Sequence, residues 1–175
     1  MASSLNLIFL APVLAWIAVT DLLYRRIANR LVLALLLVWG LGTALSVWQG
    51  TFPGWQDLVA GATAAGFVLV IGCVLFSLRW VGAGDVKLMA VLCLWFGDQA
   101  IVFLMAASLC GGLLALALPL LSALETRFAH GFMQIFFLLR LPDPPQPVAL
   151  SEHATPGIPY GIAIALGAGI VLYGS

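Results

Sequence analysis

The sequence predicts an all-α, polytopic membrane protein with about six transmembrane helices, forming one domain over residues 1–175. Composition gives the first reason. Hydrophobic residues make up 63% of the chain and charged residues only 8%, whereas a soluble domain carries roughly 25% charged residues. The second reason is that the apolar residues gather in segments close to the about 20 residues that a helix needs to cross the hydrocarbon core.

Five apolar segments are long enough, or nearly so, to span the bilayer. They cover residues 5–24, 31–48, 58–78, 101–124 and 157–173. A sixth, residues 85–96, is short, and we expect a half-depth helix entered from a loop that is buried in protein. Gly97-Asp98-Gln99 breaks the pattern after it. Residues 128–141 are expected to lie at the interface, and the proline-rich residues 141–159 to form a loop.

The basic residues predict how these helices are oriented. With six spans, all 7 Lys and Arg residues fall at one end of the bundle, after the first, third and fifth spans. They are Arg25, Arg26, Arg30, Arg79, Lys87, Arg127 and Arg140. Cytoplasmic loops of membrane proteins carry the excess of Lys and Arg. We therefore expect this end to face the cytoplasm and both termini to lie outside it.

Several classes of ligand are not indicated. The formal net charge is zero, so nothing points to a nucleic-acid partner. The 3 cysteines form no C-x-x-C pair, and His130 and His153 have no ligand-like spacing, so neither a metal site nor a disulfide framework is expected. No cofactor is indicated, and the partner that composition does predict is membrane lipid. The first apolar segment lacks a basic start and a cleavage-site pattern, so we expect a retained helix.

Two acidic residues stand out against the apolar segments. Asp21 closes the first segment, and Asp85 ends the motif Gly82-Ala83-Gly84-Asp85. An ionisable group at membrane depth is costly and marks a functional site by default. The charge pattern places both acids near the same face, so they can share one site. Two carboxylates that hold one proton between them can hydrolyse a peptide bond, one taking a proton from water and the other donating to the carbonyl oxygen.

The residues around Asp85 are expected to support it. Gly82 and Gly84 allow close approach of the backbone or a positive φ. Asp85 is expected at the N-cap or in the first turn of the helix that follows. Lys87 is expected either to tune the acid pair or to extend to the membrane interface.

Other interpretations of the two acids remain open. Asp85 alone is compatible with a helix cap at the membrane surface. Asp21 alone is compatible with an i,i+4 pair with Arg25. Intramembrane acids also mark proton relays, so a transporter or proton-pathway protein is the alternative to an enzyme. A transporter typically shows a broken helix in each half, and only the region of Gly82 suggests one. A structural membrane subunit is the third interpretation.

At these residues the sequence resembles the type IV prepilin peptidases, which are membrane aspartyl proteases with a G-x-G-D motif. Asp21 opens Asp-Leu-Leu-Tyr-Arg-Arg-Ile-Ala-Asn-Arg, similar to the family's first motif, although Ala28 stands where the family usually has proline. Gly-Ala-Gly-Asp-Val-Lys-Leu, residues 82–88, is similar to the second motif. Pro159-Tyr160-Gly161 resembles the start of the family's last helix.

The resemblance implies an activity and a set of residues. It implies that Asp21 and Asp85 are catalytic and that the basic leader of a type IV prepilin is cleaved at the cytoplasmic face of a bacterial inner membrane. Arg25 and Arg26 are expected to set topology and, with the segment 159–161, are candidates for substrate contact. Longer members carry an N-terminal region with C-x-x-C pairs and also methylate their product. This chain resembles the short form of Tad/Flp pilus systems, so methylation is not expected.

Overall fold

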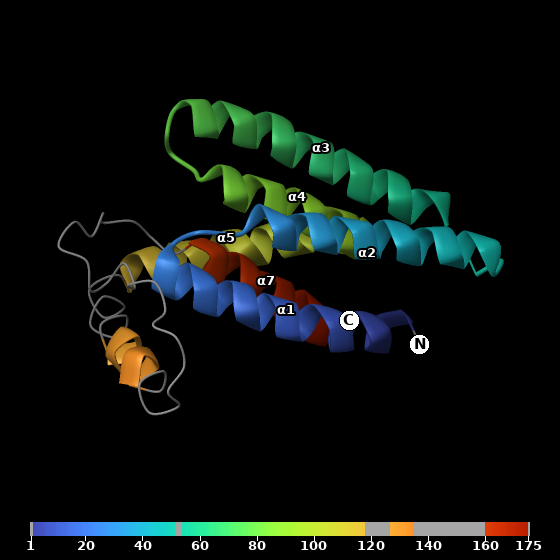
Figure 1. The fold of residues 1–175 in the computed structure, drawn as a ribbon. Helices are drawn as coiled ribbons and strands as arrows, with labels where there is room; N and C mark the ends of the chain where they lie inside the picture. Colours follow the sequence, from blue (N-terminus) through green and yellow to red (C-terminus); the bar gives the residue numbers. More distant parts are fainter. Residues whose placement is uncertain (1, 52–53, 118–126, 135–159, 175) are drawn as a thin grey trace.

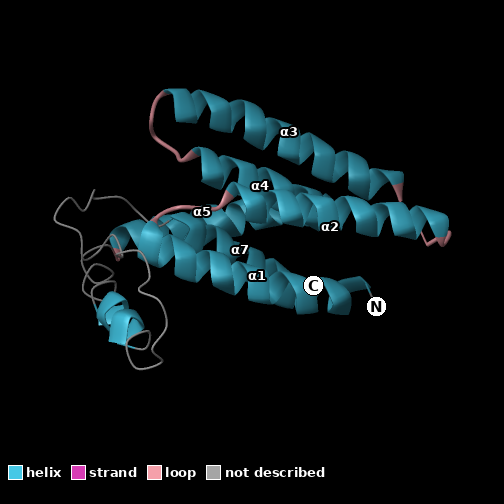
Figure 2. Cartoon of the chain, viewed as in Figure 1, coloured by secondary structure: helices cyan, strands magenta, loops and turns pink. Residues whose placement is uncertain are grey.

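The computed structural model describes residues 2–51, 54–117, 127–134 and 160–174, and these contain helices and turns but no strand (Figures 1 and 2). The helices are α1 (Ala2–Tyr24), α2 (Asn29–Trp48), α3 (Trp55–Ser77), α4 (Ala83–Phe96), the 3-10 turn η1 (Gly97–Gln99), α5 (Ala100–Leu116) and α7 (Tyr160–Gly174). Residues 127–134 are also helical. The predicted all-α class is confirmed for the described residues.

Length and composition identify a membrane protein. Within the described residues, three helical stretches are long and apolar enough to cross a membrane: Asn29–Trp48, Trp55–Ser77 and Ala83–Leu116. Phe9–Tyr24 and Tyr160–Gly174 are apolar but shorter. The predicted interruption near Gly97 is confirmed, because α4 ends at Phe96 and η1 separates it from α5. The predicted end of the fifth segment and the predicted loop 141–159 lie outside the described residues.

Two helices are central to the packing. Helix α7 packs against both α1 and α5, and α4 packs against α2, α3 and α5. The chain reverses at η1, where Gly97 has a φ of 57° that favours glycine. Helices α4 and α5 therefore form a hairpin (Figure 1).

Small residues bring α3 close to this hairpin. A Cβ on Gly61 would lie 3.0 Å from the carbonyl oxygen of Cys93, and one on Gly72 would lie 2.3 Å from Val86 Cγ1. Ala65 is buried between these two levels of α3. Membrane helices approach closely where their interface is lined by such residues, so these three positions let α3 and α4 pack closely.

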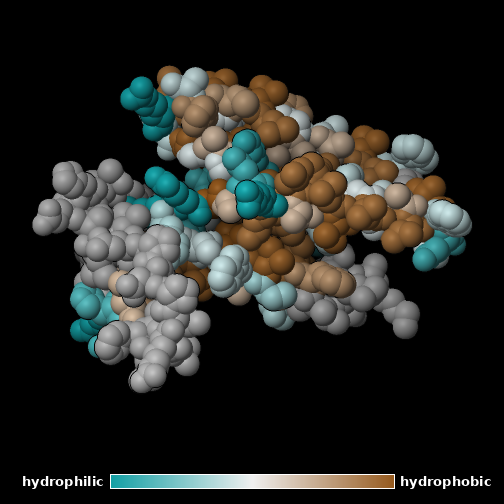
Figure 3. Space-filling view, viewed as in Figure 1, coloured by the Kyte–Doolittle hydropathy of each residue, from teal (hydrophilic) through white to brown (hydrophobic). Residues whose placement is uncertain are grey.

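One end of the bundle gathers the polar residues that matter for function. The last turn of α1 and the first turns of α4 and α7 lie at this end, while the start of α1 and the end of α7 lie at the opposite end (Figure 1). Hydrophilic surface lies mostly near helix ends, and an apolar surface covers α2 and α3 between them (Figure 3). This is the surface pattern expected of helices that cross a bilayer.

Candidate active site

Asp21 lies in the last turn of α1, with only 5% of its surface exposed. Its Oδ2 accepts a 2.7 Å hydrogen bond from the backbone N–H of Gly161. Gly161 is the second residue of α7, where N–H groups have no partner within the helix. A Cβ on Gly161 would lie 2.8 Å from Asp21 Cγ, so only glycine fits here without displacing the carboxylate. Asp21 is thus held by the N-terminus of another helix.

Asp85 occupies the first turn of α4, as predicted, three residues after the N-cap Gly82. The backbone of Gly82 hydrogen bonds to the Asp85 carboxylate, which is the backward contact that an acid at this position makes in a capping box. The carboxylates of Asp85 and Asp21 lie close enough to interact electrostatically. The fold therefore brings together two acids that are 64 positions apart in the chain. Asp21 accepts a hydrogen bond from the first turn of α7, and Asp85 accepts one at the start of α4.

The glycines of the motif act through close approach. Gly82 has an extended backbone with a φ of −73°, and Gly84 does not have a positive φ either. Neither glycine is therefore needed for a left-handed backbone. A Cβ on Gly82 would lie 2.9 Å from Asp85 Oδ2, and one on Gly84 would lie 3.1 Å from Ile27 Cβ. Gly84 therefore lets the start of α4 pack against the segment that joins α1 to α2, which keeps Asp85 near Asp21.

Tyr160 adds a hydroxyl to the same region. It is half-buried, lies within electrostatic range of Asp85 and immediately precedes Gly161. Its ring packs on Gly111 of α5, where a Cβ would lie 2.9 Å from Tyr160 Cε2. The sequence motifs point to Tyr160 and Gly161, whereas Gly111 and Ile27 bear no chemical signature and are identified only by the structure.

The basic residues near the motifs face different surroundings. Arg25 leaves α1 with a φ of 48°, and its backbone N–H bonds to the Asp21 carbonyl oxygen at 2.9 Å. Arg26 is exposed and lines a cavity of about 400 Å³ with Trp16 and Ile27. Lys87 is exposed and donates to Asn29 Oδ1 of α2 at 3.3 Å. Pro159 lies outside the described residues.

In the described part of the chain, no three His, Cys, Asp or Glu side chains come together as a metal site would require. The groups that the site does bring together are the two carboxylates and the Tyr160 hydroxyl. Proton transfer to and from water is what two neighbouring carboxylates can perform.

Comparison with known proteins places this arrangement in a family. No curated protein and no solved structure matches the chain. Residues 8–116 match the type IV leader peptidase family, and this range contains both Asp21 and Asp85. Helix α7, which binds Asp21 through Gly161, lies beyond the matched residues. Because the match covers more than half of its length, the chain belongs to the type IV leader peptidase family.

Proposed function

We propose that this protein is a membrane aspartyl endopeptidase that removes the basic leader of a type IV, Flp-like prepilin at the cytoplasmic face of a bacterial inner membrane. The observation that carries the proposal is the meeting of Asp21 and Asp85, from α1 and α4, within electrostatic range of each other. Membership of a leader peptidase family supports the reaction and the general class of substrate.

The proposed mechanism uses one proton shared by the two carboxylates. The ionised carboxylate takes a proton from a water molecule, whose oxygen attacks the carbonyl carbon of the scissile peptide bond. The protonated carboxyl donates its proton to the carbonyl oxygen, giving a tetrahedral diol. Return of the protons releases the leader's carboxyl end and the amine of the mature pilin. The N–H groups of Gly161 and Gly82 orient the two carboxylates for these steps.

Tyr160 and the basic residues have proposed roles at the substrate. The Tyr160 hydroxyl lies near Asp85 and can donate to a peptide carbonyl bound there. Arg25 and Arg26 follow Asp21 by four and five positions and are proposed to set topology and to contact the substrate beside the scissile bond.

Substitution of each acid tests the proposal. Asp21→Asn and Asp85→Asn keep side-chain shape but remove the acid, and each should lower cleavage of a co-expressed prepilin by about 10²–10⁴-fold, the usual contribution of acid–base groups. Asp98→Asn is the matched control, because Asp98 is exposed in η1, away from the dyad. Processing is followed as a mobility shift, and membrane insertion by fractionation. Full processing by either dyad variant would contradict the assignment.

A further inference from the structure

Helices α2 and α3 leave a groove between them, with α4 as its floor. Both helices pack against α4. Two hydrogen bonds fix α2 over α4: Lys87 Nζ to Asn29 Oδ1 at 3.3 Å, and Trp95 Nε1 to the Leu35 carbonyl oxygen at 3.2 Å. The groove widens into a cavity of about 510 Å³. These two contacts hold the α2 wall of the groove in place over α4.

The cavity is apolar except at one end. Its sides carry aliphatic residues of all three helices, among them Leu36 of α2, Leu69 of α3 and Leu94 of α4. Leu36 and Leu69 are 38% and 42% exposed, so the groove opens toward the lipid side of the bundle. Asn29 and Lys87 are the polar residues that line the cavity, and they lie at the active-site end of α2 and α4.

The size of the cavity favours a single chain over a helix. A helix about 10 Å across and rising 5.4 Å per turn fills about 400 Å³ per turn. A cavity of about 510 Å³ would hold little more than one such turn. It lies within the about 300–1,000 Å³ typical of sites for small ligands. A flexible hydrocarbon chain can follow a cavity of this size, whereas a helix would fill it within little more than one turn.

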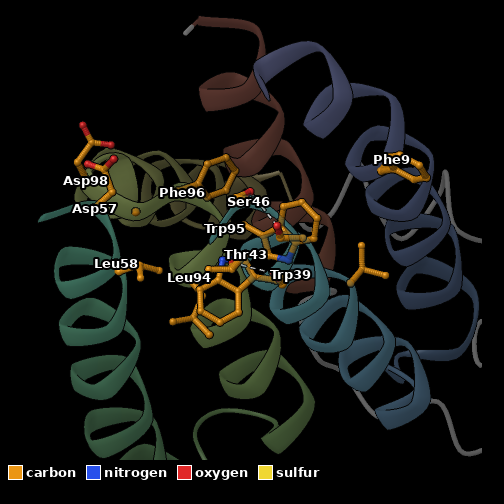
Figure 4. A pocket seen from close by; sticks show the side chains of 13 residues that line it. Phe9, Trp39, Thr43, Ser46, Asp57, Leu58, Leu94, Trp95, Phe96 and Asp98 are labelled. Atoms are coloured by element: carbon orange, nitrogen blue, oxygen red, sulfur yellow. Dashed lines mark hydrogen bonds between the residues drawn. The ribbon is translucent and has the colours of Figure 1, made fainter. Parts of the chain in front are cut away.

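The charges at the two ends of the groove differ in sign. A second cavity of about 440 Å³ shares Leu94 with the first and lies toward the other end of α2. Asp57 and Asp98 lie at its edge (Figure 4). An anionic group would be repelled there and attracted at Lys87, whose ammonium has three donors, one of them directed at Asn29. An anionic amphiphile therefore fits the groove in one direction only.

From these observations we propose that the groove binds one anionic phospholipid. Lys87 and Asn29 hold the phosphate, and an acyl chain lies along Leu36 and Leu69 toward Leu94. Lys87 follows Asp85 by two residues on α4. The bound headgroup thus links the start of α2 to the helix that carries one acid of the dyad. The proposal concerns a lipid and does not depend on the proposed peptidase activity.

Native mass spectrometry of the purified chain tests the site. The protein is stripped of lipid and then exposed to phosphatidylglycerol or to phosphatidylcholine with the same acyl chains. We expect one phosphatidylglycerol to be retained per chain, and Lys87→Gln to weaken retention by about tenfold or more, as loss of a charged hydrogen bond predicts. Arg79→Gln is the matched control, because Arg79 lies at the same end of the bundle but does not line the groove.

A second variant keeps the test decisive if Lys87→Gln fails to fold. Leu69→Trp fills the apolar part of the groove while leaving Lys87 in place, and it should also reduce retention. Equal retention of the two lipids by the unaltered protein would overturn the proposal. So would undiminished phosphatidylglycerol binding by both variants. Because no substrate is present, these outcomes are separate from success or failure of the cleavage assay.

Discussion

The backbone N–H of Gly161 donates a 2.7 Å hydrogen bond to Asp21 Oδ2, joining residues 140 positions apart. This contact links the first and last described helices of the chain at the level of the acid pair. It depends on the absence of a side chain, because a Cβ on Gly161 would lie 2.8 Å from the Asp21 carboxyl.

Gly161→Ala should therefore impair catalysis more than folding. The added methyl group pushes the Asp21 carboxylate from its position, and a displacement of about 1 Å can cost about 10²-fold in rate. Prepilin cleavage by the purified variant measures the effect. Gly169→Ala is the control, since it makes the same change in the same helix where a Cβ meets no atom within 4 Å. Equal activity of the two variants would mean that the Gly161 contact is incidental.

Gly84→Val should lower activity with little loss of membrane insertion. A Cβ at Gly84 would lie 3.1 Å from Ile27 Cβ, and the larger valine would push α4 away from the segment that follows α1. We expect cleavage to fall by about tenfold or more as Asp85 moves from Asp21. Gly66→Val, in a helix position with no atom within 4 Å, controls for adding a β-branched residue. Near-normal turnover of the Gly84 variant would show that the motif glycine does not position Asp85.

Both termini should lie outside the cytoplasm. The charge pattern predicts this orientation, because all 7 Lys and Arg residues fall at one end of the predicted bundle. Reporter fusions at Ser175 and near Gln146 should report opposite sides of the membrane. A cytoplasmic reporter at Ser175 would overturn the predicted six-span topology.

Cleavage should be independent of metal ions and should leave the product unmethylated. A carboxylate pair activates water without a metal, and the chain has no C-x-x-C pair like those of the longer, methylating relatives. Purified enzyme is given a prepilin with a chelator in one sample and S-adenosylmethionine in another. Chelator-sensitive cleavage restored by zinc would argue for a metalloprotease. A methylated product amine, seen by mass spectrometry, would reveal a second activity.

The sequence predicted the helices well because hydrophobic length and glycine-rich breaks are local signals. Expected segments 31–48 and 58–78 correspond to α2 and α3, and the short segment before Gly97 corresponds to α4. Asp21 and Asp85 stand out in the sequence because acids are rare in apolar segments. Their spatial neighbours were harder to predict.

What the sequence could not predict depends on contacts between distant segments. The pattern of apolar residues along the chain does not predict that the N–H of Gly161 donates to Asp21, or that Ile27 lies against Gly84. The sequence allows Lys87 either to tune the acid pair or to extend to the interface, and the structure shows its ammonium hydrogen-bonded to Asn29 of α2. Arg79 has a φ of 61° just after α3, at a position where glycine is usual, and an arginine there does not predict this conformation.

The place of α7 between α1 and α5 has a consequence for the order in which the protein is made. A nascent chain that has been synthesised only through α5 already carries both aspartates, but it lacks the N–H group that holds Asp21. Asp21 can gain this hydrogen bond only after α7 has been synthesised and has packed beside α1. Under the proposed function, proteolytic competence would therefore follow the synthesis of α7 and not that of the two aspartates alone.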